Sequence, residues 1–209
     1  MVKNIIFDID GTLLDTKEAG LAALQKTLLE EYNIKQTIAE LEFAFSSTAD
    51  QVFKKYQIPE SEYTSMAQKV TSNAFEFTDE VKPFPGIKFL LAELNHRQVP
   101  MAVVTSETRD ELEDIFLQTS ISPYFHHFVT ADQVSHPKPA AEPTLKALEL
   151  LEARPEETLF VGDAATDIGS AHHADVAFGL ATWGANSSQD FTEAEYQFQT
   201  PQEILATLN

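Results

Sequence analysis

Apolar residues occur along this chain in short runs, and the spacing of these runs predicts strands that alternate with helices. Residues 3–9 (KNIIFDI) form a run that is typical of a buried strand. Further strands are predicted at 99–105, 126–131, 157–163, 174–181 and 195–199, and helices near 87–96, 108–118 and 143–152, from Thr166, and after Thr200-Pro201. This alternation predicts an α/β fold, a doubly wound and mostly parallel sheet covered by helices on both faces.

One block departs from the alternation. From Thr16 to about Glu80 the apolar spacing is helical, as at Leu21, Leu24 and Leu28, and no segment has a convincing strand pattern. The sequence KPFPG at 82–86 then breaks the helical pattern as a stiff linker. We therefore expect a core made of residues 1–15 and 82–209, with a helical domain inserted at 16–81.

The composition excludes several classes of function, although it says little about the fold. The chain has 209 residues, no cysteine and a formal net charge of −19, so disulfides, thiolate metal sites and cysteine nucleophiles are excluded. Such an acidic protein is not expected to bind nucleic acid or an anionic membrane. No apolar stretch is long enough for a membrane helix or a signal peptide, so we expect a cytoplasmic protein.

Polar residues follow the predicted strands where each strand ends. In open parallel sheets, ligands bind at these carboxyl ends, near the point where the strand order reverses. The residues in these positions are Asp8, Asp10, Thr105, Ser106, Lys138, Asp163 and, one helical turn further, Asp167.

Two of these clusters have simple structural interpretations when each is taken alone. Asp10-Gly11 is compatible with an ordinary turn, and Asp163 and Asp167 with a helix N-cap followed by a solvated acid. Together, however, the acids would repel one another, because two unit charges 4 Å apart interact by about 4 kcal/mol at an effective dielectric near 20. A hard divalent cation with oxygen ligands removes this problem, which favours Mg²⁺, and Lys138 would offset further negative charge.

Because it contains these residues, the sequence resembles the haloacid dehalogenase-like superfamily of phosphatases, and the resemblance extends over nearly its whole length. Its four motifs occur in order as DIDGT (Asp8, Asp10), VVTS (Thr105), HPKP (Lys138) and GDAATD (Asp163, Asp167). The resemblance implies a Rossmann-like core, and block 16–81 would be the family's helical cap. The segment GLATWGAN is similar to the phosphoglycolate phosphatase and pyrophosphatase branch.

The resemblance also implies roles for individual residues. Asp8 would be the nucleophile that forms an aspartyl phosphate, and Asp10 the acid and base that protonates the leaving oxygen and activates water. Thr105 and Lys138 would complete the catalytic set. The implied phosphate-binding residues are Thr105, Ser106, Lys138 and Gly11, the implied Mg²⁺ residues are Asp8, Asp10, Asp163 and Asp167, and the cap substrate contacts are Ser47 and Thr48.

The function expected on this basis is Mg²⁺-dependent hydrolysis of a small phosphorylated metabolite by a monomer or homodimer. A β-phosphoglucomutase-like phosphomutase is the main alternative; it would need a cation in the cap, where residues 16–81 contain no arginine but do contain Lys54 and Lys55. A receiver-type signalling domain, which accepts a phosphoryl group without turnover, is an alternative of another class. A catalytically idle relative used for protein contacts is a third.

Overall fold

The structure, a computed structural model, describes residues 1–47, 49–186 and 189–208. The chain divides into two compact units: Met1–Asp15 with Pro83–Asn209, and Thr16–Lys82. We call the first the core unit and the second the helical unit, and each is described by itself.

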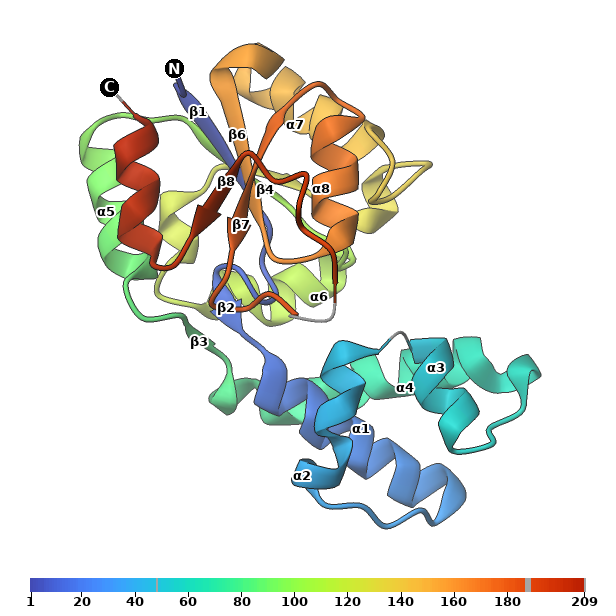
Figure 1. Ribbon diagram of the computed structural model, residues 1–209. Helices are drawn as coiled ribbons and strands as arrows, with labels where there is room; N and C mark the ends of the chain where they lie inside the picture. The colour runs from blue at the N-terminus through green and yellow to red at the C-terminus, as the bar shows by residue number, and fades with distance from the viewer. Residues whose placement is uncertain (48, 187–188, 209) are drawn as a thin grey trace. The chain divides into compact units, whose positions relative to one another are not determined.

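The core unit is built on a six-stranded sheet whose paired strands all run parallel (Figure 1). Its strands are β1 (Asn4–Phe7), β4 (Met101–Val104), β5 (His127–Val129), β6 (Thr158–Gly162), β7 (Ala177–Ala181) and β8 (Tyr196–Phe198), in the spatial order β5-β4-β1-β6-β7-β8. This arrangement confirms the predicted α/β fold with a mostly parallel sheet.

Helices cover both faces of this sheet, which explains why its central strands are mostly apolar and fully buried. The helices α7 (Glu142–Leu151) and α8 (Ala165–His172) pack on one face, where they bury Ile6, Phe160 and Phe178. On the other side, α5 (Ile87–His96) packs beside the C-terminal 3₁₀ helix η8 (Pro201–Thr207).

The strand order places the topological switch point at the centre of the sheet. From β1 the chain first builds β4 and β5 on one side and then returns to add β6, β7 and β8 on the other. Phe7, the last residue of β1, is in register with Val103 of β4 and Val161 of β6. The residues that follow β1, β4 and β6 therefore emerge side by side at the topological switch point, where ligands bind in such sheets.

The helical unit consists of α1 (Lys17–Tyr32), α2 (Ile38–Leu41), α3 (Ala49–Lys55) and α4 (Tyr63–Ala74), joined by 3₁₀ turns. Its own small core includes Leu24, Leu28 and Leu41, so the helical apolar spacing of this block does bury one face. The α2 helix begins at a capping box in which Thr37 and Glu40 satisfy each other's backbone N–H groups.

The predicted helix at 108–118 is wrong in its second half. The α6 helix ends at Asp114, since Ile115 has φ −112° and ψ −72°, and a 3₁₀ turn follows at Phe116–Gln118. The ring of Phe116 is fully buried, with ring centroids 5.8 Å from Phe125 and 6.0 Å from Phe128. Aromatic packing in the core thus accompanies a change of backbone path that local helical spacing does not show.

A short strand pair, which the sequence did not predict, occurs at the two ends of the helical insertion. Strands β2 (Leu14–Asp15) and β3 (Lys82–Pro83) form a separate two-stranded sheet. Next to it, the N–H of Phe84 donates to the carbonyl of Leu13 at 3.1 Å. Two-residue strands have no recognisable alternation, so only the folded chain shows this pairing.

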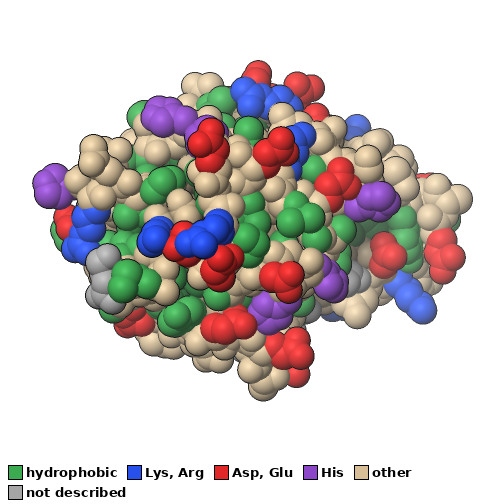
Figure 2. All heavy atoms as spheres, turned by 90° about the horizontal axis from the view of Figure 1, so that it is seen from above, with side chains coloured by type: hydrophobic (Ala, Val, Ile, Leu, Met, Phe, Trp, Pro, Cys, Tyr) green, Lys and Arg blue, Asp and Glu red, His purple; other side chains and the backbone are tan. Residues whose placement is uncertain are grey.

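Charged side chains are scattered rather than gathered on the face shown in Figure 2, where acids alternate with hydrophobic, neutral and basic groups. The negative charge on that face is therefore not concentrated at one place, as is typical of surface charge that favours solubility. Within the part of the chain that the structure describes, no helix combines the length and the apolar character needed to cross a membrane.

Candidate active site

Asp8 is the first residue after β1, and it lies at the switch point of the sheet. Its N–H donates to the carbonyl of Val161 at 3.0 Å, which extends the pairing with β6 by one residue. The side chain is buried, with the residue 6% exposed. The following loop is compact, because the N–H groups of Thr12, Leu13 and Leu14 all point to the carbonyl of Ile9. This turn holds the half-buried Asp10 two residues beyond Asp8.

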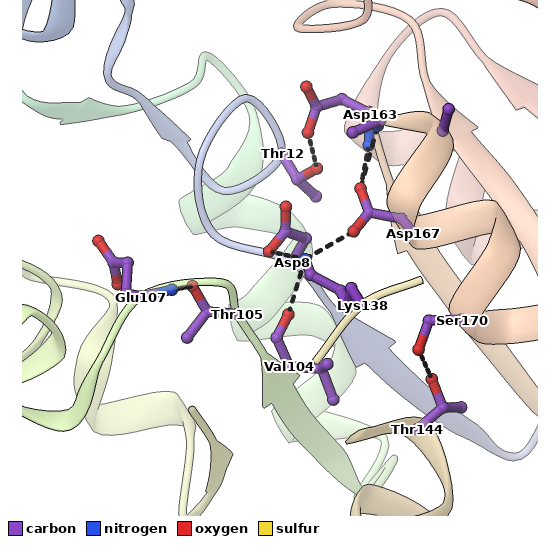
Figure 3. A network of polar contacts seen from close by, with 12 residues as sticks. Asp8, Thr12, Val104, Thr105, Glu107, Lys138, Thr144, Asp163, Asp167 and Ser170 are labelled. Carbon is purple, nitrogen blue, oxygen red and sulfur yellow. Dashed lines mark hydrogen bonds and ion pairs between the residues drawn. The ribbon is translucent and has the colours of Figure 1, made fainter. Parts of the chain in front are cut away.

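Lys138 links two of the predicted acids. Its Nζ donates to Asp8 Oδ1 at 2.8 Å and to Asp167 Oδ1 at 2.6 Å, and it lies 3.5 Å from the carbonyl oxygen of Val104 (Figure 3). The Lys138 side chain is only 2% exposed and that of Asp167 is fully buried. Asp8 and Asp167, which are 130 and 29 positions from Lys138 in the chain, thus both contact its buried ammonium group.

Asp167 has a double role. While Oδ1 accepts from Lys138, Oδ2 accepts from the N–H groups of Asp163 at 3.2 Å and Ala164 at 3.0 Å. The carboxylate therefore satisfies free N–H groups at the start of α8 and stabilises the helix N-terminus. Gly162 is required here, because a Cβ on it would lie 2.5 Å from Asp167 Oδ2.

Asp163 is held by the loop after β1. Thr12 Oγ1 donates to Asp163 Oδ1 at 3.0 Å. Gly11, between Asp10 and Thr12, has φ +76°, a conformation that side chains disfavour, and a Cβ there would collide with the Asp163 carboxylate. Gly11 thus permits close approach of the β1 loop to the β6 loop.

The residues after β4 form the other side of the site. Thr105 is buried, its N–H continues the ladder to Val129, and its Oγ1 accepts from the N–H of Glu107 at 3.1 Å. Ser106 is exposed. In the view of Figure 3, Glu107 lies on the opposite side of Asp8 from Asp163.

One lysine does not neutralise the acids that converge here. Burial raises the pKa of Asp8 to about 7, with the charge of Asp167 adding to the effect and Lys138 opposing it. Burial likewise raises the pKa of Asp163 to about 8, reinforced by Asp167 and Asp8. Burial alone would lower the pKa of Lys138, but the carboxylates of Asp167 and Asp8 outweigh burial and leave this pKa raised. The site is therefore short of positive charge.

The same acids fit a divalent metal. One carboxylate oxygen from each of Asp8, Asp163 and Asp167 lies within 4.8 Å of the others. Hard oxygen donors of this kind suit Mg²⁺ better than softer metals. Since buried carboxylates with raised pKa values are those that a cation would stabilise in the ionised form, the donor set and its electrostatics agree.

The predicted cap contacts belong to the helical unit. Ser47 lines an apolar hollow of ≈ 410 Å³, together with Leu21, Leu24 and Val52, and its hydroxyl donates to the carbonyl of Phe43 at 2.9 Å. Thr48 lies outside the described residues. The ammonium group of Lys55, named above for the mutase alternative, lies 3.3 Å from the ring centroid of Phe43.

Several residues that shape the site were missed by sequence reasoning. Thr12 positions Asp163, and the indole of Trp183 donates to the carbonyl of Thr12 at 2.9 Å. Gly184 packs so closely on Gly11 that a Cβ would collide with the Gly11 carbonyl. The two hydrogen bonds join residues 151 and 171 positions apart, so local sequence has no signal for them.

Comparison with known proteins identifies the class to which this fold and site belong. The family model described as haloacid dehalogenase-like hydrolase matches residues 5–181. The chain belongs to this family, and it is an enzyme of the phosphatase class.

Individual relatives are similar over most of their length. The pyrophosphatase PpaX of Oceanobacillus iheyensis is 34% identical over 184 residues, which cover 87% of this chain and 84% of the relative. A phosphoglycolate phosphatase of Aquifex aeolicus is 33% identical over 186 residues, covering 86% and 84%. A solved structure of a candidate phosphoglycolate phosphatase from Lactobacillus plantarum superposes with a TM-score of 0.87 at 29% identity and covers 99% of both chains.

Proposed function

We propose that this protein is a Mg²⁺-dependent phosphatase that hydrolyses a small phosphorylated metabolite through an aspartyl-phosphate intermediate. The observation that carries the proposal is the position of Asp8, at the switch point, hydrogen-bonded to Lys138 and clustered with Asp163 and Asp167. Hydrolysis rather than transfer within the substrate is supported by the phosphatase names of the relatives.

In the proposed reaction, a carboxylate oxygen of Asp8 attacks phosphorus and displaces the alcohol oxygen. Asp10 gives that oxygen its proton as the bond to phosphorus breaks. Asp10 then takes a proton from a water molecule whose oxygen attacks the aspartyl phosphate, so inorganic phosphate leaves and Asp8 is regenerated. Lys138, Thr105, Ser106 and the backbone at Gly11 bind the phosphoryl oxygens.

The charge balance of the site explains the need for a metal. A carboxylate does not readily approach a phosphate dianion unless cations offset both charges, and Lys138 supplies only one. Mg²⁺ held by Asp8, Asp163 and the main-chain carbonyl of Asp10 would neutralise this charge. Both oxygens of Asp167 are engaged by Lys138 and by backbone N–H groups. We therefore assign Asp167 to positioning Lys138 and the metal-binding loop.

The helical unit is the part to which we assign substrate selection, as a cap on the catalytic core. Its apolar hollow is lined in part by Ser47, one of the residues expected to contact the substrate. Pyrophosphate and phosphoglycolate, named for the relatives above, are the first substrates to test. We propose a cytoplasmic location, which the absence of cysteine supports.

The test compares the wild type with Asp8→Asn on an aryl phosphate, with Mg²⁺ and with the metal removed by a chelator. We expect the variant to lose at least about 10³-fold in kcat, because the amide is not a competent nucleophile, while a thermal melt shows that it folds. Metal removal should abolish wild-type turnover.

Two further measurements make the test sharper. Rapid acid quenching of the wild-type reaction should trap phosphate on Asp8, detected by mass spectrometry of the peptide that contains it. Glu157→Gln, on the exposed Lys3–Glu157 ion pair, serves as an acid-to-amide control and should keep full activity. Equal rates for the wild type and Asp8→Asn would overturn the assignment of the nucleophile.

A further inference from the structure

Glu107 is an acid of the site for which the mechanism above has no use. It lies in the loop between β4 and α6, two residues after Thr105. Its backbone is held at both ends: the N–H donates to Thr105 Oγ1 at 3.1 Å, and the carbonyl accepts from the N–H of Ala131 at 2.8 Å. The place from which its side chain projects is therefore well defined.

The side chain ends in an unsatisfied polar atom. Among the residues that the structure describes, Glu107 Oε2 is the buried side-chain oxygen or nitrogen that has no hydrogen-bond partner. A buried polar atom in this state lowers the stability of the fold, and nearly all such atoms in native proteins are paired. A partner supplied by a ligand is the direct physical explanation.

The charged groups around Glu107 indicate which part of a substrate it would meet. Burial raises the pKa of Glu107 to about 9; the negative charges of Asp10, Asp8 and Glu111 add to this effect, in that order, and Lys138 opposes it. Asp10, the strongest of the charges, is also the residue proposed to protonate the leaving oxygen. Glu107 therefore lies near the acid proposed to protonate the leaving oxygen, and Figure 3 shows it on the other side of Asp8 from Asp163. The ammonium group of Lys138 points instead to Asp8 and Asp167.

The chemistry of a carboxyl group then limits the partner. An anionic leaving group pairs only with a protonated carboxyl, and an ammonium group only with an ionised one. A hydroxyl pairs with both forms, because it can donate to either and can also accept from the protonated acid. A hydroxyl therefore fits Glu107 whether its carboxyl group is protonated or ionised.

We infer that Glu107 is a specificity-determining residue whose Oε2 accepts a hydrogen bond from a hydroxyl on the leaving group. The enzyme would therefore prefer phosphate monoesters whose alcohol carries a further hydroxyl over those that lack it. This inference rests on the proposed phosphatase function. A substrate that lacks the hydroxyl leaves the buried oxygen unpaired, and sites of this kind discriminate strongly against such analogues.

The experiment uses a matched pair of esters, glycerol 3-phosphate and propyl phosphate, which differ only in two hydroxyl groups. Phosphate release by the full-length enzyme with Mg²⁺ gives kcat/KM for each. We expect the wild type to prefer glycerol 3-phosphate at least about 10-fold. Glu107→Ala should reduce this preference to near 1, chiefly by lowering kcat/KM for glycerol 3-phosphate, and Glu107→Gln, whose amide oxygen still accepts, should retain part of it.

Controls separate the possible failures. Glu113→Gln, an exposed acid on α6 that pairs with Arg109, should leave the preference unchanged. Thermal melts show whether each variant folds, and the Gln variant remains informative if the Ala variant does not. A wild-type preference near 1, or a preference that Glu107→Ala and Glu107→Gln both leave intact, would overturn this inference alone. Failure to hydrolyse both esters, with Asp8-dependent turnover of the aryl phosphate intact, would likewise overturn the inference alone. Absence of Asp8-dependent turnover of the aryl phosphate as well would overturn the proposed function and the inference with it.

Discussion

Lys138 holds the acids of the site together, because its ammonium group contacts both Asp8 and Asp167 while almost completely removed from solvent. Removing one partner of a buried ion pair leaves charge that is neither solvated nor paired. The stabilisation by Lys138 is thus expected to differ in kind from that of exposed pairs, which contribute little.

Lys138→Met tests this difference at the scale of one residue. We expect the variant to lose about 3–5 kcal/mol of unfolding free energy in the absence of metal, together with nearly all activity. Urea denaturation measures the first and phosphate release the second.

The matched control is Lys3→Met, which removes an ion pair with Glu157 whose lysine is 58% exposed. This change should cost less than about 1 kcal/mol and leave activity intact. Similar losses of stability in the two variants would contradict the assigned role of the buried lysine.

At the scale of elements, each unit contains a glycine, and the two have opposite effects on stability. Gly11 turns the chain after β1 with φ +76° and makes room for Asp163. Gly20 lies inside α1, and a Cβ there would meet no atom within 4 Å. The first glycine is required by its conformation and contacts, and the second only weakens a helix.

We therefore expect Gly20→Ala to stabilise the helical unit by about 0.5–1 kcal/mol and Gly11→Ala to destabilise the core unit. Gly11→Ala should also weaken Mg²⁺ binding, because the new Cβ displaces the Asp163 carboxylate. Thermal melts and Mg²⁺ titrations of both variants check these outcomes. A Gly11→Ala protein with wild-type stability and Mg²⁺ affinity would show that the close approach to Asp163 is dispensable.

At the scale of the whole molecule, the crowded acids couple stability to pH and metal. The pKa values of Asp8, Asp163 and Glu107 are raised to about 7, 8 and 9 from ordinary values of 3.8, 3.8 and 4.5. At pH values between the ordinary and the raised pKa values, these three carboxyl groups bind more protons in the folded protein than in the unfolded chain. The free energy of unfolding therefore falls as pH rises through this range.

The metal-free protein should accordingly show a Tm that decreases from about pH 5 to pH 9. Added Mg²⁺ should raise the Tm more at pH 8 than at pH 5, because only ionised carboxylates bind it. Differential scanning calorimetry with and without Mg²⁺ measures both effects.

Asp163→Asn is the control for this prediction. It removes one of the titrating ligands, so the pH slope should flatten and the Mg²⁺ gain should shrink. A metal-free Tm that increases between pH 5 and 9 would contradict the proposed charge balance.

The sequence by itself determined the architecture and the main reactive groups of this protein. The centres of the predicted strands, such as 5–7 and 159–161, are uninterrupted apolar runs because strands buried on both faces need apolar side chains at every position. Asp8 and Asp163 follow these runs closely, so their convergence at one sheet edge follows from the parallel topology, whereas Lys138 reaches that edge from the longer loop between β5 and α7.

Only the tertiary structure decided how these groups are paired and which other residues hold them. The bonds of Thr12 to Asp163 and of Trp183 to Thr12, and the unpaired oxygen of Glu107, depend on distances between segments that are remote in sequence. The end of α6 at Asp114 likewise accompanies the burial of Phe116 against Phe125 and Phe128. Local sequence patterns indicate which side chains must be buried. Hydrogen bonds and ion pairs instead require distances of a few ångströms, and only folding brings residues that are remote in sequence so close together.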